Sequence, residues 1–263
     1  IKSHHNRVQD VLDLMSSGKV VEPLKDLYKD EVRQVGTLLG LPDSIVLRHP
    51  FPGPGLSINI LCSNGKEGFT ELKKTAELVS KCLKNSNCDS QILPVRSVGV
   101  QGDKRTYKLP AALRNAPRDW CWLEKEATLL TNEVRGINRV VVQLGSNFKD
   151  SNAPFLVRKA FCNSDRLDLL REVDFFATQM LKKNSLMREI FQLLVILLPI
   201  SKNGKEDSIV LRPVVSEDVM TAQFARIDWH LLDPLVESIL SLSGIETVFY
   251  DITHKPPGTF GWE

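Results

Sequence analysis

The stretch DWCWLEKEATLLTNEVRGINRVVVQ, residues 119–143, has a counterpart in DWHLLDPLVESILSLSGIETVFYD, residues 228–251. Each begins with Asp-Trp, continues with apolar residues at helical intervals, and passes through Gly-Ile into an apolar run typical of a strand. A strand is also expected upstream of each copy, over 97–100 and 209–215. The sequence therefore predicts a duplicated strand-helix-strand unit, with chance similarity of two amphipathic segments as the alternative.

Helical spacing of apolar residues also predicts helices within 20–42, over 69–83 and within 152–183. The first of these should end at Gly40, because a glycine followed shortly by a proline is a stop signal. The apolar run 193–200 predicts a buried strand. Such a mixture of helices and strands places the chain in the α/β and α+β classes.

The composition is that of a globular chain of one or two domains, with 263 residues of which 42% are hydrophobic. A net charge of +2, from 34 basic and 32 acidic residues, provides no broad field that would attract nucleic acid or a membrane surface. The apolar run 193–200 is the longest in the chain and is far shorter than the ~20 residues that span a bilayer. We therefore expect neither nucleic acid nor a membrane as a partner.

The five cysteines include no Cys-x-x-Cys pair, which argues against a disulfide framework and against a zinc site. A reducing, cytosolic location and no metal site are the corresponding expectations. The chain begins with Ile1 rather than Met, and we expect it to start inside a longer polypeptide.

The run HPFPGPGL, residues 49–56, interleaves rigid and permissive residues. Its prolines fix their own φ and favour extended neighbours, while Gly53 and Gly55 permit a positive φ or the close approach of a ligand. We expect a stiff, non-helical segment that can present the cation of the preceding Arg48 and backbone N–H groups to an anion. The alternative is a proline-rich connector between two domains.

Two further segments carry several polar groups that suit a phosphate. The opening IKSHHN, residues 1–6, offers a lysine and two histidines as donors, although a frayed terminus is the alternative. In VGVQGDKRTY, residues 98–107, a strand runs into a glycine turn, an acid and two cations. That pattern is typical of a phosphate site or of a solvated hairpin tip.

Near the end of the chain, Gln192 borders the apolar run 193–200, where a lone glutamine is usually a polar cap of a strand. The closing HKPPGTFGWE, residues 254–263, places Lys255 before two prolines and a glycine. A disordered terminus is the default for such a tail. Its prolines and Trp262 nevertheless provide stiffness and an apolar anchor.

These segments together resemble the C-terminal part of glutamine-hydrolysing GMP synthase. IKSHHN, EPLKDLYKDEVR, RHPFPGPGL, VGVQGD and KPPGT-x-x-WE stand in the family's order and cover nearly the whole chain. The resemblance implies that residues 1–48 end an ATP pyrophosphatase domain with an adenine-nucleotide-hydrolase-like fold. Residues 49–263 would form the dimerisation domain, with related subdomains at about 91–150 and 190–263. The two copies are similar to the enlarged form of animal-type members.

The resemblance also implies a ligase that converts XMP to GMP with ATP and glutamine-derived ammonia, through an adenyl-XMP intermediate. Mg²⁺ would neutralise the pyrophosphate leaving group and would be bound mainly by residues upstream of this chain. The glutaminase domain, a partner in the same polypeptide, and the pyrophosphate loop would also lie upstream. The chain alone should therefore hydrolyse neither glutamine nor ATP.

The implied catalytic residues are the end of a mobile lid over ATP and XMP: Lys2, Ser3, His4, His5 and Asn6. The implied XMP-binding residues are Arg48, His49, Pro50, Gly53, Gly55, Asp103, Arg105, Gln192 and Lys255. Of these, Arg105 and Lys255 suit the phosphate, and Gln192 suits the base or the ribose.

One departure from the family pattern stands at Gly261, where related chains commonly carry an acid. Glycine has no side chain to accept a hydrogen bond, so one XMP contact that the resemblance implies is in question here. Two functions remain open: a portion of a synthase, or a non-catalytic nucleotide-binding and dimerisation module. The duplicated unit is expected either to mediate a homodimer or to imitate one internally in a pseudo-dimeric monomer.

Overall fold

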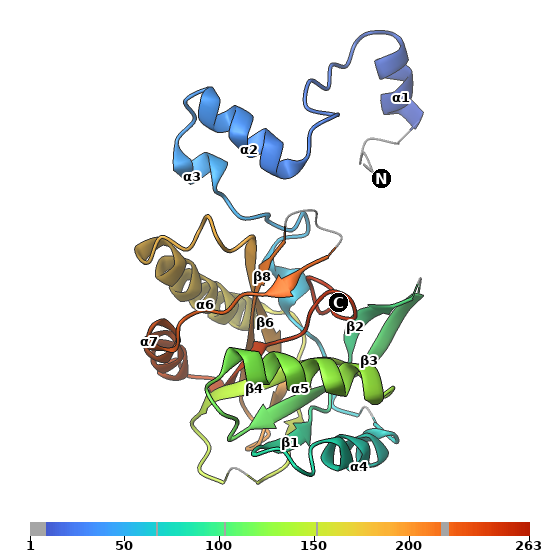
Figure 1. Cartoon of the computed structure of the whole chain (residues 1–263), viewed down its shortest axis with the longest axis vertical. Coiled ribbons are helices and arrows are strands. Elements are labelled where there is room, and N and C mark those ends of the chain that lie inside the picture. Colours follow the sequence, from blue (N-terminus) through green and yellow to red (C-terminus); the bar gives the residue numbers. More distant parts are fainter. Residues whose placement is uncertain (1–8, 67, 103, 151, 217–220) are drawn as a thin grey trace. The chain divides into compact units, whose positions relative to one another are not determined.

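The computed structural model describes residues 9–66, 68–102, 104–150, 152–216 and 221–263. The chain divides into two compact units, Ile1–Arg48 and His49–Glu263. The described part of the first unit contains only helices, α1 (Gln9–Ser16), α2 (Lys29–Leu38) and α3 (Asp43–Val46), drawn in blue in Figure 1. None of the helices in the described part of the chain is long and apolar enough to cross a membrane.

Helix α2 confirms the helix that the sequence predicts within 20–42. At its start, the Tyr28 backbone N–H donates to the Glu31 carboxylate at 2.6 Å, which satisfies a donor that the first helical turn leaves unpaired. Beyond its end, Gly40 adopts a φ of +76°, a left-handed conformation that glycine accepts at little cost. The chain turns there, and α3 begins directly after Pro42.

The second unit is built on an eight-stranded sheet in the order β1-β3-β4-β10-β8-β6, with β2 paired to β3 and β9 paired to β8. The strands are β1 (Asp89–Ile92), β2 (Ser97–Gln101), β3 (Lys104–Arg114), β4 (Ile137–Ser146), β6 (Gln192–Leu198), β8 (Asp207–Val215), β9 (Gln223–Phe224) and β10 (Ile245–Asp251). Two short strands, β5 (Leu156–Val157) and β7 (Ile200–Ser201), form a separate pair. The β2–β3 hairpin extends away from the rest of the sheet (Figure 1).

The sheet has a symmetric arrangement about its central pair of strands, β4 and β10, because the strands on either side of this pair have matching directions. These two strands are antiparallel, β3 is parallel to β4 as β8 is to β10, and β1 and β6 are antiparallel to β3 and β8. The matching helices are α4 (Leu72–Cys82), α5 (Trp120–Glu133), α6 (Ser164–Lys183) and α7 (Trp229–Leu240). The duplication predicted from the sequence is therefore confirmed, and it extends to the helix and strand that precede each copy.

The prediction is wrong for one strand of the repeat. The sequence assigns residues 97–100 as the first strand of the first copy, whereas β3 occupies that place, because β3 is the strand that is parallel to β4. Residues 97–101 form β2, the antiparallel hairpin partner of β3. A short apolar run beside a glycine turn does not indicate which of the two hairpin strands continues into the sheet. Here β3 does so, although it begins with more polar residues than β2.

The sheet is buried on both faces. Along β4, Val140 and Val142 belong to the core cluster that includes α4 to α7, while Val141 belongs to a second cluster on the opposite face. That second face is covered by Phe155 and by Trp262 of the C-terminal tail. Because both faces are covered, the central strands are apolar at successive positions rather than at alternate ones.

The HPFPGPGL segment is non-helical up to Gly55, as predicted. Gly55 has a φ of +80°, and its N–H donates to the Pro52 carbonyl oxygen at 2.9 Å, which closes a turn. A short 3₁₀ helix, η1 (Leu56–Asn59), follows. The chain then runs beside β6, where the Leu61 N–H donates to the Leu197 carbonyl oxygen at 3.0 Å.

Candidate functional site

Gln192 connects the HPFPGPGL segment to the sheet. It is the first residue of β6, as a strand-end cap should be, and its side chain is half-buried. The Gln192 Nε2 donates to the Pro50 carbonyl oxygen at 2.8 Å. Two regions that the sequence singled out separately, 142 residues apart in the chain, thus meet within the second unit.

The C-terminal tail is ordered rather than frayed. Lys255 exchanges two backbone hydrogen bonds with Ala222, at 2.8 and 3.2 Å, and the Lys255-Pro256 and Pro256-Pro257 peptide bonds are cis. The Val100 N–H donates to the Pro257 carbonyl oxygen at 2.7 Å. The tail therefore lies along the edge of β2, beside the hairpin that carries Arg105.

The ammonium group of Lys255 lies 4.6 Å from the centroid of the Phe260 ring. Phe260 in turn packs against Phe191, with ring centroids 5.8 Å apart. Because Phe191 immediately precedes β6, these contacts connect Lys255 to the start of that strand. The sequence did not single out either phenylalanine as part of a site.

The residue before Lys255 is also held. The His254 Nε2 lies 2.8 Å from a carboxylate oxygen of Glu124 on α5, and the His254 ring stacks on Phe224 at 5.3 Å between centroids. The other Glu124 oxygen accepts from Arg226 at 2.5 Å. The His254 side chain therefore contacts both halves of the duplicated fold.

Arg105 stands on β3 opposite Val100, near the tip of the hairpin, and is exposed. Gly102, at the tip, has a φ of +64°. Strands β2 and β3 therefore form a hairpin that presents a cation at its surface.

Beneath the tail, Asp251 lies between two arginines, Arg139 and Arg212. The Asp251 Oδ2 accepts from Arg139 at 2.9 Å, the Oδ1 lies 2.9 Å from the Arg212 guanidinium, and all three side chains are fully buried. Burial by itself would raise the pKa of Asp251. The charges of Arg212 and Arg139, together with hydrogen bonds from Thr253, outweigh it and hold this pKa below its ordinary value.

The same two arginines bind the carbonyl groups of the tail. Arg139 donates to the Gly261 carbonyl oxygen at 2.6 Å, and the Arg212 Nε donates to the carbonyl oxygens of Thr259 at 2.8 Å and Phe260 at 3.1 Å. A buried charge inside an apolar strand is the sequence signal that sequence reasoning overlooked, since Arg139, Arg212 and Asp251 all stand in such strands.

Several predicted residues cannot be placed in this arrangement. The expected lid residues lie outside the described residues, and these are Lys2, Ser3, His4, His5 and Asn6. Asp103 also lies outside the described residues. Arg48 belongs to the first unit, where its carbonyl oxygen accepts from Arg33 at 3.3 Å. His49 and Pro50 begin the second unit.

Gly53 and Gly55 border open space. A Cβ atom added at either position would meet no atom within 4 Å, and only Gly55 has a positive φ. The fold therefore requires a glycine at Gly55 and not at Gly53. Among the described residues, no group of three or more histidine, cysteine, aspartate or glutamate side chains could hold a metal ion.

Residues 179–262 match the family model of the GMP synthase C-terminal domain. The chain is 43% identical over 264 residues to a probable glutamine-hydrolysing GMP synthase of Leptospira interrogans, covering all of this chain and 43% of that protein. It is 34% identical over 305 residues to the enzyme of Dictyostelium discoideum, covering 98% of this chain and 42% of that protein. It is 33% identical over 332 residues to the probable enzyme of Caenorhabditis elegans, covering 100% of this chain and 45% of that protein.

The chain thus spans less than half the length of the curated relatives it matches. The matched domain contains β6 to β10 and α7, which is the second copy of the duplicated unit. Since one whole-chain match is bacterial, the form with both copies is not confined to animals. The chain contains the GMP synthase C-terminal domain over residues 179–262 and is related over its whole length to the glutamine-hydrolysing GMP synthases.

Proposed function

We propose that this chain is the C-terminal portion of a glutamine-hydrolysing GMP synthase, which converts XMP to GMP with ATP and ammonia through an adenyl-XMP intermediate. The observation that carries the proposal is a pair of contacts at the start of β6, one from Gln192 to Pro50 and one from Phe191 through Phe260 to Lys255. These contacts connect an amide, the HPFPGPGL segment and a cation within the second unit of a chain whose relatives bear that name.

Within this proposal, Lys255 and Arg105 bind the XMP phosphate. Both are cations able to donate charge-assisted hydrogen bonds, and Arg105 is exposed on its hairpin. Gln192 binds the base or the ribose. One of its amide hydrogens is used by Pro50, while its amide oxygen accepts no hydrogen bond from a residue in the described part of the chain. Asp103 would act beside Arg105, and Arg48, His49, Gly53 and Gly55 would border the nucleotide.

Residues 2–6 act as the end of the lid that closes over ATP and XMP. Lysine and histidine donors there would stabilise charge that develops as the xanthine oxygen is adenylated. The described residues form no cluster that would bind Mg²⁺, so we derive no step through a metal held by this chain. In the proposal, Mg²⁺ arrives with ATP and is bound mainly by residues outside this chain.

The two units correspond, in this proposal, to two domains: residues 1–48 to the end of an ATP pyrophosphatase domain, and residues 49–263 to the dimerisation domain. The first unit leaves large apolar side chains uncovered, with Leu38 87% and Leu39 75% exposed. Apolar surface of this extent on so small a unit supports the view that it packs against a further part of a larger domain.

The dimerisation domain, we propose, is pseudo-dimeric. The antiparallel pair β4 and β10 joins the two copies in one chain, in the way that identical subunits pair across a two-fold axis. A clean monomer in sedimentation would support internal pairing, and a dimer would support pairing between chains. We further propose a cytosolic location, which the five free cysteines support.

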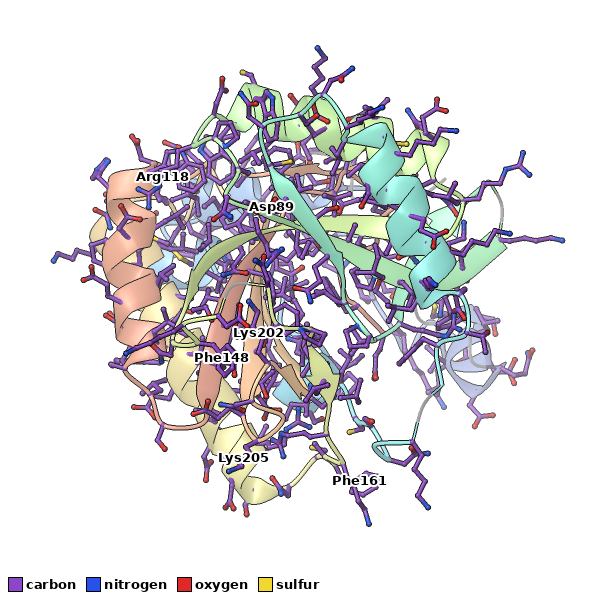
Figure 2. The ribbon with its side chains drawn as sticks, turned by 90° about the horizontal axis from the view of Figure 1, so that it is seen from below. Asp89, Arg118, Phe148, Phe161, Lys202 and Lys205 are labelled. Atoms are coloured by element: carbon purple, nitrogen blue, oxygen red, sulfur yellow. The ribbon has the colours of Figure 1, made fainter. Side chains whose placement is uncertain are left out.

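The test is XMP binding and turnover by the full-length protein with ATP and glutamine. We expect GMP formation, and Lys255→Ala should weaken XMP binding roughly ten- to hundredfold, since a charged hydrogen bond contributes ~1.5–3 kcal/mol. The matched control is Lys205→Ala, an exposed lysine on the loop after β7 (Figure 2), which should bind XMP normally. Binding without turnover would favour the non-catalytic module, and unchanged affinity of Lys255→Ala would remove Lys255 from the site.

A further inference from the structure

Arg139 lies where the β2–β3 hairpin, the C-terminal tail and the second copy of the repeat meet. It stands on β4, in the first copy, and its side chain is fully buried. Its guanidinium group donates to the carboxylate of Asp251 on β10, in the second copy, at 2.9 Å. The first copy thereby contributes a buried cation to the region from which the tail emerges.

One nitrogen of this guanidinium group binds both the hairpin and the tail. The Arg139 Nη2 donates to the Val98 carbonyl oxygen on β2 at 2.9 Å. It also donates to the Gly261 carbonyl oxygen and to the Thr259 hydroxyl oxygen in the tail, each at 2.6 Å. The Trp262 ring lies over the same group, with its centroid 5.2 Å from the guanidinium carbon. Arg139 therefore connects two segments that are 161 residues apart in the chain.

The hairpin and the tail also pair directly through their backbones. The Val98 N–H donates to the Trp262 carbonyl oxygen at 2.8 Å, and the Val100 N–H donates to the Pro257 carbonyl oxygen at 2.7 Å. Figure 1 accordingly shows the C-terminus beside β2. A Cβ added at Gly99 would lie only 2.7 Å from the Pro257 carbonyl oxygen, so the two backbones approach as closely as a glycine allows.

This pairing sets the hairpin against the tail at the place where both carry residues of the proposed site. Val100 lies opposite Arg105 in the hairpin register, and its N–H is the group that binds Pro257. Lys255 stands two residues before Pro257. A shift of the tail along β2 would therefore change the spacing of the two segments that the proposed function assigns to the XMP phosphate. Binding groups must be held within a fraction of an ångström of the productive geometry.

We infer that Arg139 is a positioning residue, which fixes the tail against the β2–β3 hairpin and so sets the spacing of these two segments for the phosphate of a nucleoside monophosphate. This inference rests on the proposed function. It assigns Arg139 no contact with the substrate, since its side chain is fully buried and acts through the hairpin and the tail.

The chain offers a matched control in Arg166 on α6, whose side chain is 5% exposed. The Arg166 Nε donates to Asp207 at 2.9 Å, and the Nη1 donates to the carbonyl oxygens of Leu61 and Phe161 at 3.0 and 3.3 Å. These partners lie outside the hairpin and the tail. If Arg166 is replaced, Asp207 keeps Arg158 as a partner at 2.7 Å.

The experiment measures XMP affinity and kcat separately in the full-length protein. Arg139→Met removes the bonds to the hairpin and the tail but leaves Asp251 paired with Arg212 at 2.9 Å. It should weaken XMP binding roughly ten- to hundredfold and leave kcat at saturating XMP nearly unchanged. Arg166→Met also removes a buried guanidinium group, and it should bind XMP as the parent does.

Hydrogen exchange reports the position of the tail without any ligand. The amides of Val98 and Val100 donate to tail carbonyl oxygens, so a loosened tail should expose them. We expect these two amides to exchange faster in Arg139→Met than in Arg166→Met. If Arg139→Met does not fold, Arg139→Lys keeps a cation beside Asp251 without the planar set of donors and serves for the same measurements.

Two results would overturn the inference: an XMP affinity in Arg139→Met equal to that of the parent, or an equal loss of affinity in Arg166→Met. If the parent protein binds no XMP at all, the proposed function fails, and the exchange of the Val98 and Val100 amides then tests Arg139 alone. Faster exchange in Arg139→Met than in Arg166→Met would support its hold on the tail, and equal rates would refute it.

Discussion

The indole rings of Trp120 and Trp229 stack face to face, with centroids 4.3 Å apart and an angle of 8° between their planes. Each is the first residue of its helix, α5 or α7, and each follows the aspartate that opens one copy of the repeat. Arg118, which Figure 2 shows next to α7, lies over the Trp229 ring at 5.4 Å from its centroid and pairs with Asp233 of that helix. The two copies are thus joined by like residues, as expected at a pseudo-two-fold axis.

Replacing Trp120 should weaken the junction between the copies. Trp120→Ala removes the stacking contact and the hydrogen bond from the indole N–H to the Ile227 carbonyl oxygen at 3.0 Å. We expect a loss of about 2–4 kcal/mol in the free energy of unfolding, measured by chemical denaturation. The control is Phe175→Ala on α6, whose ring is 57% exposed and whose removal should cost little. Equal losses for both variants would contradict a structural role for the stack.

The sequence predicted the repeat, most helices and the individual polar clusters, because amphipathic spacing and Gly-Pro signals are local. These local signals did not predict which clusters meet, since the bond between Gln192 and Pro50 depends on where η1 brings the chain beside β6. Only the family resemblance assigned both residues to one site. The buried arginines were missed for a related reason. Within an apolar strand, a charge such as that of Arg139 is stabilised only by partners far away in sequence, here Asp251 and the tail carbonyls.

Asp251 should contribute stability that disappears in acid. Its folded-state pKa lies below the ordinary value of 3.8, so its contribution is complete at neutral pH and is lost as the pH falls through that lowered pKa. Asp251→Asn leaves two buried guanidinium groups without their carboxylate and should cost about 3–5 kcal/mol at pH 7. The stability gap between parent and variant should narrow below about pH 4. A gap that is independent of pH would show that the charge of Asp251 is not what stabilises the tail.

Gly53 should matter for the ligand and not for the fold. A Cβ at this position would meet no atom within 4 Å, and the φ of Gly53 is not positive. Gly53→Ala should therefore change the free energy of unfolding by no more than about 0.5 kcal/mol. If a nucleotide approaches the backbone there, the added methyl group should weaken XMP binding. Gly55→Ala is the matched comparison, because its φ of +80° makes that variant strained without any ligand. Normal XMP affinity in Gly53→Ala would show that the HPFPGPGL segment is a connector and not part of the binding site.

Gly261 allows a direct test of the tail against the pattern of its relatives. A Cβ at this position would meet only the Glu263 carbonyl oxygen, at 3.8 Å, which is an ordinary van der Waals contact. The Gly261 carbonyl oxygen already accepts a hydrogen bond from Arg139, which keeps the backbone in place. Gly261→Glu should therefore fold normally, and a carboxylate that accepts hydrogen bonds from XMP should lower the half-saturating XMP concentration in the full-length protein. The gain is limited to about one charged hydrogen bond, ~1.5–3 kcal/mol, and repulsion from Glu263 should reduce it.

Gly261→Gln, which has nearly the same shape without the charge, separates hydrogen bonding from electrostatics. If Gly261→Glu leaves XMP affinity the same or weakens it, the tail of this chain binds its ligand without an acid at position 261.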